Sequence, residues 1–193
     1  MRIRLAILWI WKLIDPLFYL CSRLHYIQEE NKKKSIFRVR ITKYKGKNII
    51  LSDGTLICRN DLLIKIHLHN VRLLNEYIKM KNDLNRARQI YKTVLRSMPS
   101  LARYISTHPS ETQIKGIIGI TTINKGVVPL GFETFRPNNR LYRRAKKVGQ
   151  LPIFLLTKSS FSNFQKNKLN YLLMSKDKLY QRYGCSLPAN NNQ

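Results

Sequence analysis

The chain has 193 residues, and its 36 lysine and arginine residues against 10 aspartate and glutamate residues give a formal net charge of +26. Since 44% of the residues are hydrophobic, the composition excludes a disordered basic tail and predicts a folded chain of single-domain size. Such an imbalance repels itself, so we expect a polyanionic partner, which would be nucleic acid, an anionic lipid surface or an acidic polymer. The alternative is a charge that serves solubility alone.

The N-terminal segment, residues 4–24, has the spacing of an amphipathic helix with a wide apolar arc, broken at Pro16. Its uninterrupted apolar run is too short to cross a bilayer, and the small-residue cleavage site of a signal peptide does not follow it. We expect the helix either to pack on its own domain or to lie in the headgroup layer of a membrane. In the second case the membrane-facing side chains would be Trp9, Trp11, Leu13 and Phe18.

Strands are predicted in the next part of the chain. Residues 36–42 alternate with a period of two, which predicts a half-buried strand with Arg38 and Arg40 on its outer face. The Asp-Gly pair within residues 52–54 tolerates the positive φ angles of a tight turn and predicts a hairpin. Residues 62–69 alternate again and form the third expected strand.

The second half of the chain mixes helices with strands. Residues 71–98 have a helical period, and Pro99 is expected to break or restart that helix. Residues 116–123 predict a central strand, whereas residues 126–137 contain too many turn formers for a helix. The other expected elements are a cationic helix at 138–149, strands or buried segments at 151–157 and 169–175, and a terminal helix at 175–183.

These elements predict an α+β protein with a mostly antiparallel sheet packed by helices and an N-terminal amphipathic helix. The expected units are an amphipathic segment at 1–27, one α+β domain at 36–184 after a polar linker at 28–35, and a disordered tail at 185–193. The three cysteines, Cys21, Cys58 and Cys185, form no Cys-x-x-Cys pair. They exclude a disulfide framework and a zinc knuckle and predict a reducing compartment.

A row of cations distinguishes the helix expected at 138–149. They repeat at spacings of three and four beside a narrow apolar stripe, which is typical of a surface helix. No acidic residue lies between Glu133 and Asp177 to pair with them, which favours binding of phosphate or acidic lipid over an ordinary solvated face. The candidate anion-binding residues are Arg136, Arg140, Arg143, Arg144 and Lys147.

Two smaller groups could perform chemistry. Lys65, His67 and His69 are expected on one face of the third strand, where the histidines could bind a metal, transfer protons or be hydrogen-bonded inside the core, which is the commoner case. Glu133 lies between two phenylalanines and either forms an ion pair or acts as a base opposite His67. No phosphate-binding loop, nucleophile elbow or paired-carboxylate motif accompanies them, and no metal or cofactor is assigned.

Four landmarks in order resemble the YkoP-like family of Gram-positive bacterial proteins. They are LSDGT at 51–55, ND at 60–61, KIHLHN at 65–70 and LGFE at 130–133. The resemblance covers about residues 37–183 and implies an α+β domain. In that family the same domain also occurs fused behind polysaccharide deacetylase domains, which implies a cell-envelope polysaccharide setting. The catalytic residues of the deacetylase have no counterparts here, so that activity is not carried across.

The resemblance also narrows the candidate site. Among YkoP-like proteins a bulky aromatic residue can replace the one that matches His69, which argues against a metal bound by a His-x-His pair. His67, Asn70 and Glu133 therefore remain as candidate catalytic residues, and we expect them to face one another across a cleft.

Together these features predict a membrane-peripheral, strongly basic binding protein at the cytoplasmic face of the cell membrane, acting on or near anionic lipid or envelope polysaccharide. The expected partners are an anionic membrane surface or an acidic envelope polymer, together with polysaccharide-modifying enzymes. The first alternative is an enzyme of envelope carbohydrate or lipid metabolism that uses His67 and Glu133. The second is a nucleic-acid-binding protein, which is less favoured because aromatic residues do not cluster between cations on a strand.

Overall fold

The computed structural model describes most of the predicted domain. The described residues are 9–10, 13, 16, 19–20, 22–28, 34–77, 80, 82–121, 126–136 and 169–184. Most of the N-terminal amphipathic helix, the cationic helix at 138–149, the segment at 151–157 and the tail at 185–193 lie outside them.

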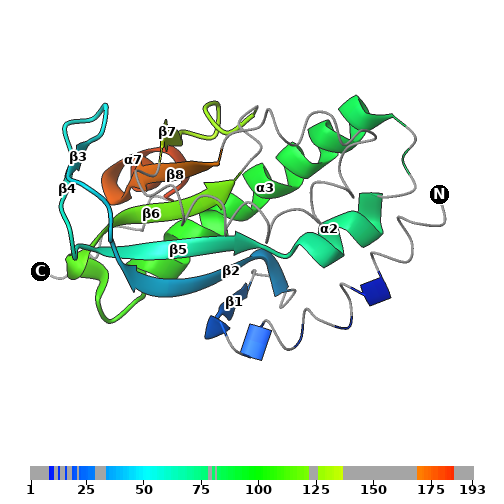
Figure 1. Ribbon diagram of the computed structural model, residues 1–193, viewed down its shortest axis with the longest axis horizontal. Coiled ribbons are helices and arrows are strands. Elements are labelled where there is room, and N and C mark those ends of the chain that lie inside the picture. The colour runs from blue at the N-terminus through cyan, green and yellow to red at the C-terminus, as the bar shows by residue number, and fades with distance from the viewer. Residues whose placement is uncertain are drawn as a thin grey trace, which may run out of the picture.

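A six-stranded sheet forms the centre of the described fold, in the order β1-β2-β5-β6-β8-β7 (Figure 1). Its neighbouring strands are antiparallel except β5 and β6, which are parallel, so the expected α+β class with a mostly antiparallel sheet is confirmed. The strands are β1 (His25–Gln28), β2 (Lys34–Lys43), β5 (Leu62–Leu68), β6 (Ile114–Thr121), β7 (Glu133–Phe135) and β8 (Asn170–Ser175). A separate hairpin joins β3 (Ile49–Ile50) to β4 (Leu56–Ile57).

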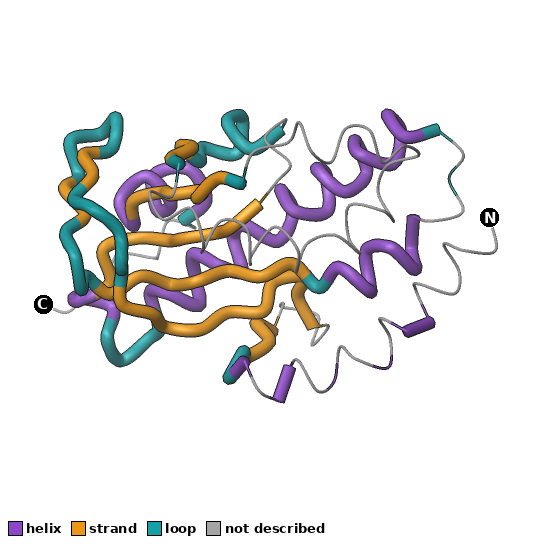
Figure 2. The backbone as a smooth tube through the Cα atoms, viewed as in Figure 1, coloured by secondary structure: helices purple, strands orange, loops and turns teal. Residues whose placement is uncertain are grey.

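Helices cover one face of this sheet, as Figure 2 shows. The crossover between the parallel strands β5 and β6 contains α2 (Asn70–Tyr77), α3 (Asp83–Ser106) and a short 3₁₀ helix at Glu111–Gln113. The C-terminal helix α7 (Lys176–Tyr183) follows β8 directly, with Ser175 as its N-cap. None of the helices in the described ranges combines the length and apolarity that a membrane crossing requires.

The helix predicted over residues 71–98 is two helices, which corrects the sequence-based expectation. The second begins because the side chain of Asn82 accepts hydrogen bonds from the backbone N–H groups of Leu84 and Asn85. Pro99 lies inside α3 and does not end it. The helix continues because residues on both sides of Pro99, such as Met98 and Leu101, are fully buried, and this packing outweighs the lost backbone hydrogen bond.

Strand alternation divides the apolar side chains between two cores. One face of the sheet packs under α3 and α7 and includes Phe37, Val39, Ile64, Ile117 and Met174. The opposite face packs under the β3–β4 hairpin, in a smaller core made of Tyr44, Leu51, Ile57, Leu63, Ile118 and Leu173. The hairpin predicted from the Asp-Gly pair thus covers the face that the helices leave open.

Candidate functional site

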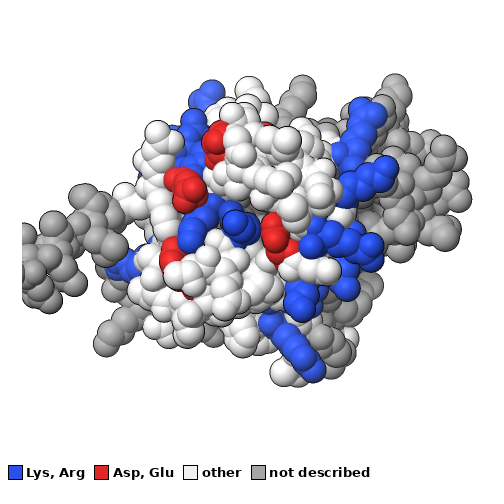
Figure 3. Space-filling view, turned by 90° about the vertical axis from the view of Figure 1, so that its left-hand side faces the viewer, with Lys and Arg blue, Asp and Glu red and all other residues white. Residues whose placement is uncertain are grey.

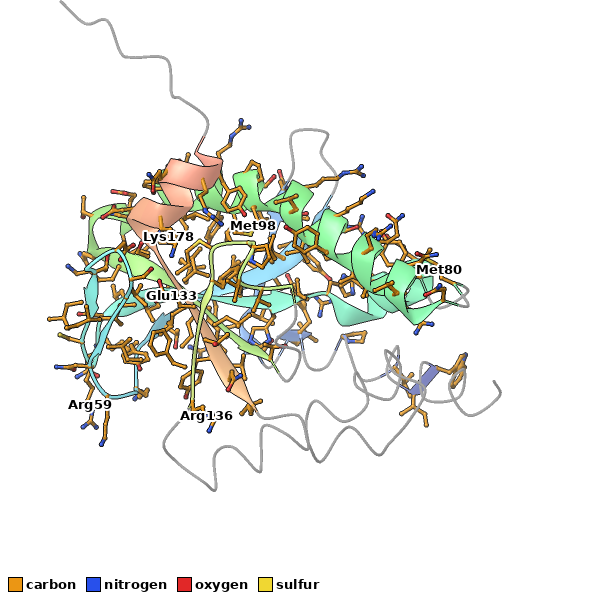
Figure 4. All side chains as sticks on the ribbon, turned by 90° about the horizontal axis from the view of Figure 1, so that it is seen from above. Arg59, Met80, Met98, Glu133, Arg136 and Lys178 are labelled. Carbon is orange, nitrogen blue, oxygen red and sulfur yellow. The ribbon has the colours of Figure 1, made fainter. Side chains whose placement is uncertain are left out.

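Five polar residues from four separate segments meet at the edge of the hairpin. We call them the anchor cluster: Ser52, Asp53, Glu133, Ser175 and Lys178. The Glu133 carboxylate accepts hydrogen bonds from the backbone N–H and the hydroxyl of Ser52, at 3.1 and 2.6 Å. Lys178 Nζ lies 3.1 Å from the same carboxylate and donates to the Ser52 hydroxyl, also at 3.1 Å (Figure 4). These contacts fasten the hairpin to β7 and α7.

The two carboxylates of the anchor cluster are held in their ionised form. Burial alone would raise the pKa of Glu133, but hydrogen bonds from Ser52 and Lys178 outweigh it and lower the pKa. The pKa of Asp53 is lowered in the same way, against the effect of burial, by bonds from Ser175 and Thr55. The Ser175 hydroxyl donates to Asp53 and accepts from the backbone N–H of Lys178, so both its bonding directions are used within the fold.

Most described carboxylates lie at this same end of the sheet. Strand direction explains the grouping, because β5 and β6 begin here and β8 ends here. Figure 3 views this end and shows red carboxylates around blue cations. The acidic residues concerned are Asp53, Asp61, Glu111, Glu133 and Asp177.

His67 lies on the same face of the sheet as Glu133, but farther from the hairpin and among several cations. Its cross-strand neighbour in β2 is Arg38, and Lys65 is opposite Arg40. Like charges opposite each other on neighbouring strands repel each other. These cations lie on a covered face of the sheet, since Arg38 is only 3% exposed. The outer position predicted for Arg38 is wrong, because the alternation of a strand does not reveal what packs above it.

Aromatic rings and the N-terminal segment provide part of that cover. The Arg38 guanidinium carbon lies 5.3 Å from the ring centroid of Tyr19 and 4.9 Å from that of Tyr26, within cation–π range. Arg38 also donates to the Tyr26 hydroxyl at 2.5 Å, and Arg40 donates to the backbone carbonyl of Ser22 at 3.0 Å. Tyr19 and Ser22 therefore lie on the sheet face opposite to α3.

The structure does not bring His67 and Glu133 into contact. Their strands are separated by β6 and β8, with Lys65, Ile118, Leu173 and Glu133 in one row across the sheet. Three strand spacings amount to about 14 Å, and His67 lies two residues farther along. Asn70 is the first residue of α2, beyond the end of β5.

Only part of the predicted anion-binding and membrane-facing sets can be placed. Arg136 is exposed directly after β7, whereas Arg140, Arg143, Arg144 and Lys147 lie outside the described residues. Trp11 and Phe18 also lie outside them. The other two membrane candidates are exposed: Trp9 by 71% and Leu13 by 67%.

Sequence reasoning missed two features of the site. It named Glu133 but not its partners in the anchor cluster, which come together from positions more than forty residues apart in sequence. It also assigned no role to the cations of α3. A metal site receives no support in the described ranges, where no three His, Cys, Asp or Glu residues are placed to share an ion.

Comparison with known proteins assigns the family. The model of the YkoP domain matches residues 4–183. The uncharacterized protein YkoP of Bacillus subtilis (strain 168) is 46% identical over 174 residues, which are 90% of this chain and 94% of that protein. No solved structure matches the chain significantly.

Proposed function

The chain belongs to the YkoP domain family, and we propose that this member is a peripheral binding protein for anionic lipid surfaces. One observation carries the proposal. Four large apolar side chains of the N-terminal segment are mostly exposed: Trp9 by 71%, Ile10 by 53%, Leu13 by 67% and Leu20 by 73%. Exposed apolar groups of this size are typical of a surface that binds a partner or a membrane.

The placement of the segment suits an interface with lipid. Tyr19 and Ser22 hold it against the sheet, while the four apolar side chains named above remain mostly exposed to solvent. Tryptophan favours the headgroup layer, and each cation near an anionic membrane contributes about 1 kcal/mol. With a net charge of +26, the protein is attracted to such a surface before its apolar groups insert. The membrane we propose is the cytoplasmic leaflet, in keeping with cysteines that predict a reducing compartment.

The two alternatives gain less from the described geometry. An enzyme that uses His67 and Glu133 would need both side chains at one substrate, and they are separated by two intervening strands. Both Glu133 oxygens also accept bonds from Ser52. A nucleic-acid-binding protein would need a surface that reads or stacks bases, and binding to oligonucleotides distinguishes it from a lipid-binding protein.

Sedimentation with lipid vesicles tests the proposal. We expect the wild-type protein to bind vesicles containing phosphatidylglycerol but not vesicles made of phosphatidylcholine alone. Replacing Trp9, Leu13 and Leu20 together with serine should weaken binding by about two orders of magnitude, since each change removes roughly 1 kcal/mol of inserted apolar surface.

A matched control uses the hairpin. Ile50 is 70% exposed and Leu56 is 48% exposed, so the Ile50→Ser/Leu56→Ser variant also removes exposed apolar surface, from two side chains in place of three, at the other end of the molecule. It should bind vesicles as the wild type does, with both variants checked for native circular dichroism. Equal binding by the three-serine variant and the wild type would contradict the proposal, as would binding to oligonucleotides but not to anionic vesicles.

A further inference from the structure

The outer face of α3 holds a straight file of exposed cations. Arg88, Lys92 and Arg96 follow one another at intervals of four residues, and Arg103 continues the file beyond Pro99. All four side chains are exposed and lie within a quarter of the helix circumference. We call these four residues the α3 stripe.

Acidic residues are absent from the sequence around the α3 stripe. No aspartate or glutamate occurs between Asp83 and Glu111. Like charges four residues apart on a helix repel each other. In α2, by contrast, Arg72 has an acidic partner one turn away, Glu76, at 2.9 Å.

The α3 stripe is also held rigidly. The opposite face of the helix is fully buried through Met98, Leu101 and Ile105, which fixes its position on the sheet. At a rise of 1.5 Å per residue, successive cations four residues apart are about 6 Å apart along the axis, and the whole stripe spans about 22 Å. A single file of charges at this spacing fits a single chain of anions better than a flat membrane.

We propose that the α3 stripe binds an unbranched polymer of phosphate groups. The stripe lies on the helix-covered side of the sheet, whereas Tyr19 and Ser22 bring the N-terminal segment to the other side. A membrane bound through Trp9 and Leu13 therefore leaves the outer face of α3 accessible to a second ligand. The inference does not depend on the lipid proposal, because it uses different residues.

The side chains beside the stripe favour a polymer without bases. Proteins that hold single-stranded nucleic acid stack the bases on exposed aromatic rings. The tyrosines of α3, Tyr91 and Tyr104, are half-buried and pack against the core. Among the described residues, the large exposed apolar side chains of α3 are Leu84 and Leu95, which offer no ring for stacking.

Titration with defined polyanions tests this inference. The probes are inorganic polyphosphate and synthetic poly(glycerol phosphate) with equal numbers of phosphates, and single-stranded DNA of the same phosphate number serves as the competitor. The test variant replaces Arg88, Lys92, Arg96 and Arg103 with glutamine, which keeps helix propensity. We expect at least tenfold weaker binding of the preferred phosphate polymer, and a slope of log Kd against log salt that is smaller by about 3.

The control variant has the same change in net charge at another place. Lys43, Lys45, Lys47 and Arg59 are exposed around the hairpin, and replacing them with glutamine should change the affinity less than about threefold.

Preference for polyphosphate or for poly(glycerol phosphate) identifies the source of the phosphate chain, and either supports the inference. Equal loss in both variants, or DNA that competes as well as the phosphate polymers, would overturn it. The three-serine variant of the N-terminal segment should bind the polymer as the wild type does, so failure of the lipid proposal leaves this test intact.

Discussion

At the scale of single residues, Glu133 shows how one carboxylate can position a whole hairpin. Its partners come from the turn after β3 and from α7, so its bonds tie together segments that are distant in sequence. The side chain is 22% exposed, which leaves little water to replace these bonds if they are lost. The strength of the anchor cluster therefore depends on the ionised form of Glu133.

Acid should weaken the bonds of Glu133 to Ser52 and Lys178, and the Glu133→Gln variant should show how much they stabilise the fold. Because the folded-state pKa lies below the ordinary value of about 4.3, the carboxylate stabilises the fold above that pH, and the effect disappears as pH falls through the lowered pKa. We expect Glu133→Gln to lower the free energy of unfolding at pH 7 by about 1–3 kcal/mol, with a smaller difference near pH 3. Urea denaturation at several pH values measures it.

The Glu76→Gln variant is the control for this prediction. Glu76 pairs with Arg72 on the surface of α2, where the two side chains are 41% and 40% exposed. Its loss should cost no more than about 0.5 kcal/mol. A pH-independent difference between the wild type and Glu133→Gln would show that packing of the side chain, and not its charge, stabilises the hairpin.

At the scale of elements, the sequence predicts what depends on local pattern and misses what depends on pairing. The strands expected at 36–42 and 62–69 are present because their alternation is complete over a whole strand. β1 and β7 were not predicted, since four and three residues are too few to show a period. They exist through hydrogen bonds to β2 and β8.

The candidate site follows the same rule. The alternation in β5 predicts that Lys65 and His67 share a face, and the register with β2 agrees. It does not reveal that β6 and β8 separate them from Glu133, because strand order is set by tertiary packing. The partners of Glu133 were equally hidden, as no local pattern links Ser52 to Lys178.

Two glycines of β6 should respond differently to the same substitution. A Cβ at Gly116 would collide with the backbone carbonyl of Met174 in β8, so Gly116→Ala requires the sheet to shift. A Cβ at Gly119 would meet side-chain atoms of Ile66 and Leu172 at 3.4 and 3.5 Å, which is ordinary contact. We expect Gly116→Ala to cost about 2–3 kcal/mol, and Gly119→Ala to change stability by less than about 1 kcal/mol, as measured by thermal unfolding. Equal losses would mean that β8 adjusts to a side chain at either position.

At the scale of the whole molecule, charge is distributed unevenly along the sheet. Carboxylates gather around the hairpin, where Glu111 also pairs with Lys176 at 2.9 Å. No acidic residue follows Asp83 in the sequence of α3. Ion pairs therefore stabilise the hairpin end, while repulsion between cations is expected along α3.

Salt should distinguish which of these two effects dominates the stability of the protein. The screening length falls from about 30 Å at 0.01 M salt to about 3 Å at 1 M, so salt weakens long-range repulsion among cations more than the short, partly buried bonds of the anchor cluster. With a net charge of +26, we expect the melting temperature to rise between 0.02 and 0.5 M sodium chloride by roughly 3–6 °C, or about 1–2 kcal/mol. Replacing the four cations of the α3 stripe with glutamine should raise the melting temperature at low salt and reduce the further rise. A melting temperature that falls with salt would instead show that the ion pairs at the hairpin end contribute more than the repulsion costs, and that the excess positive charge is already accommodated by the fold.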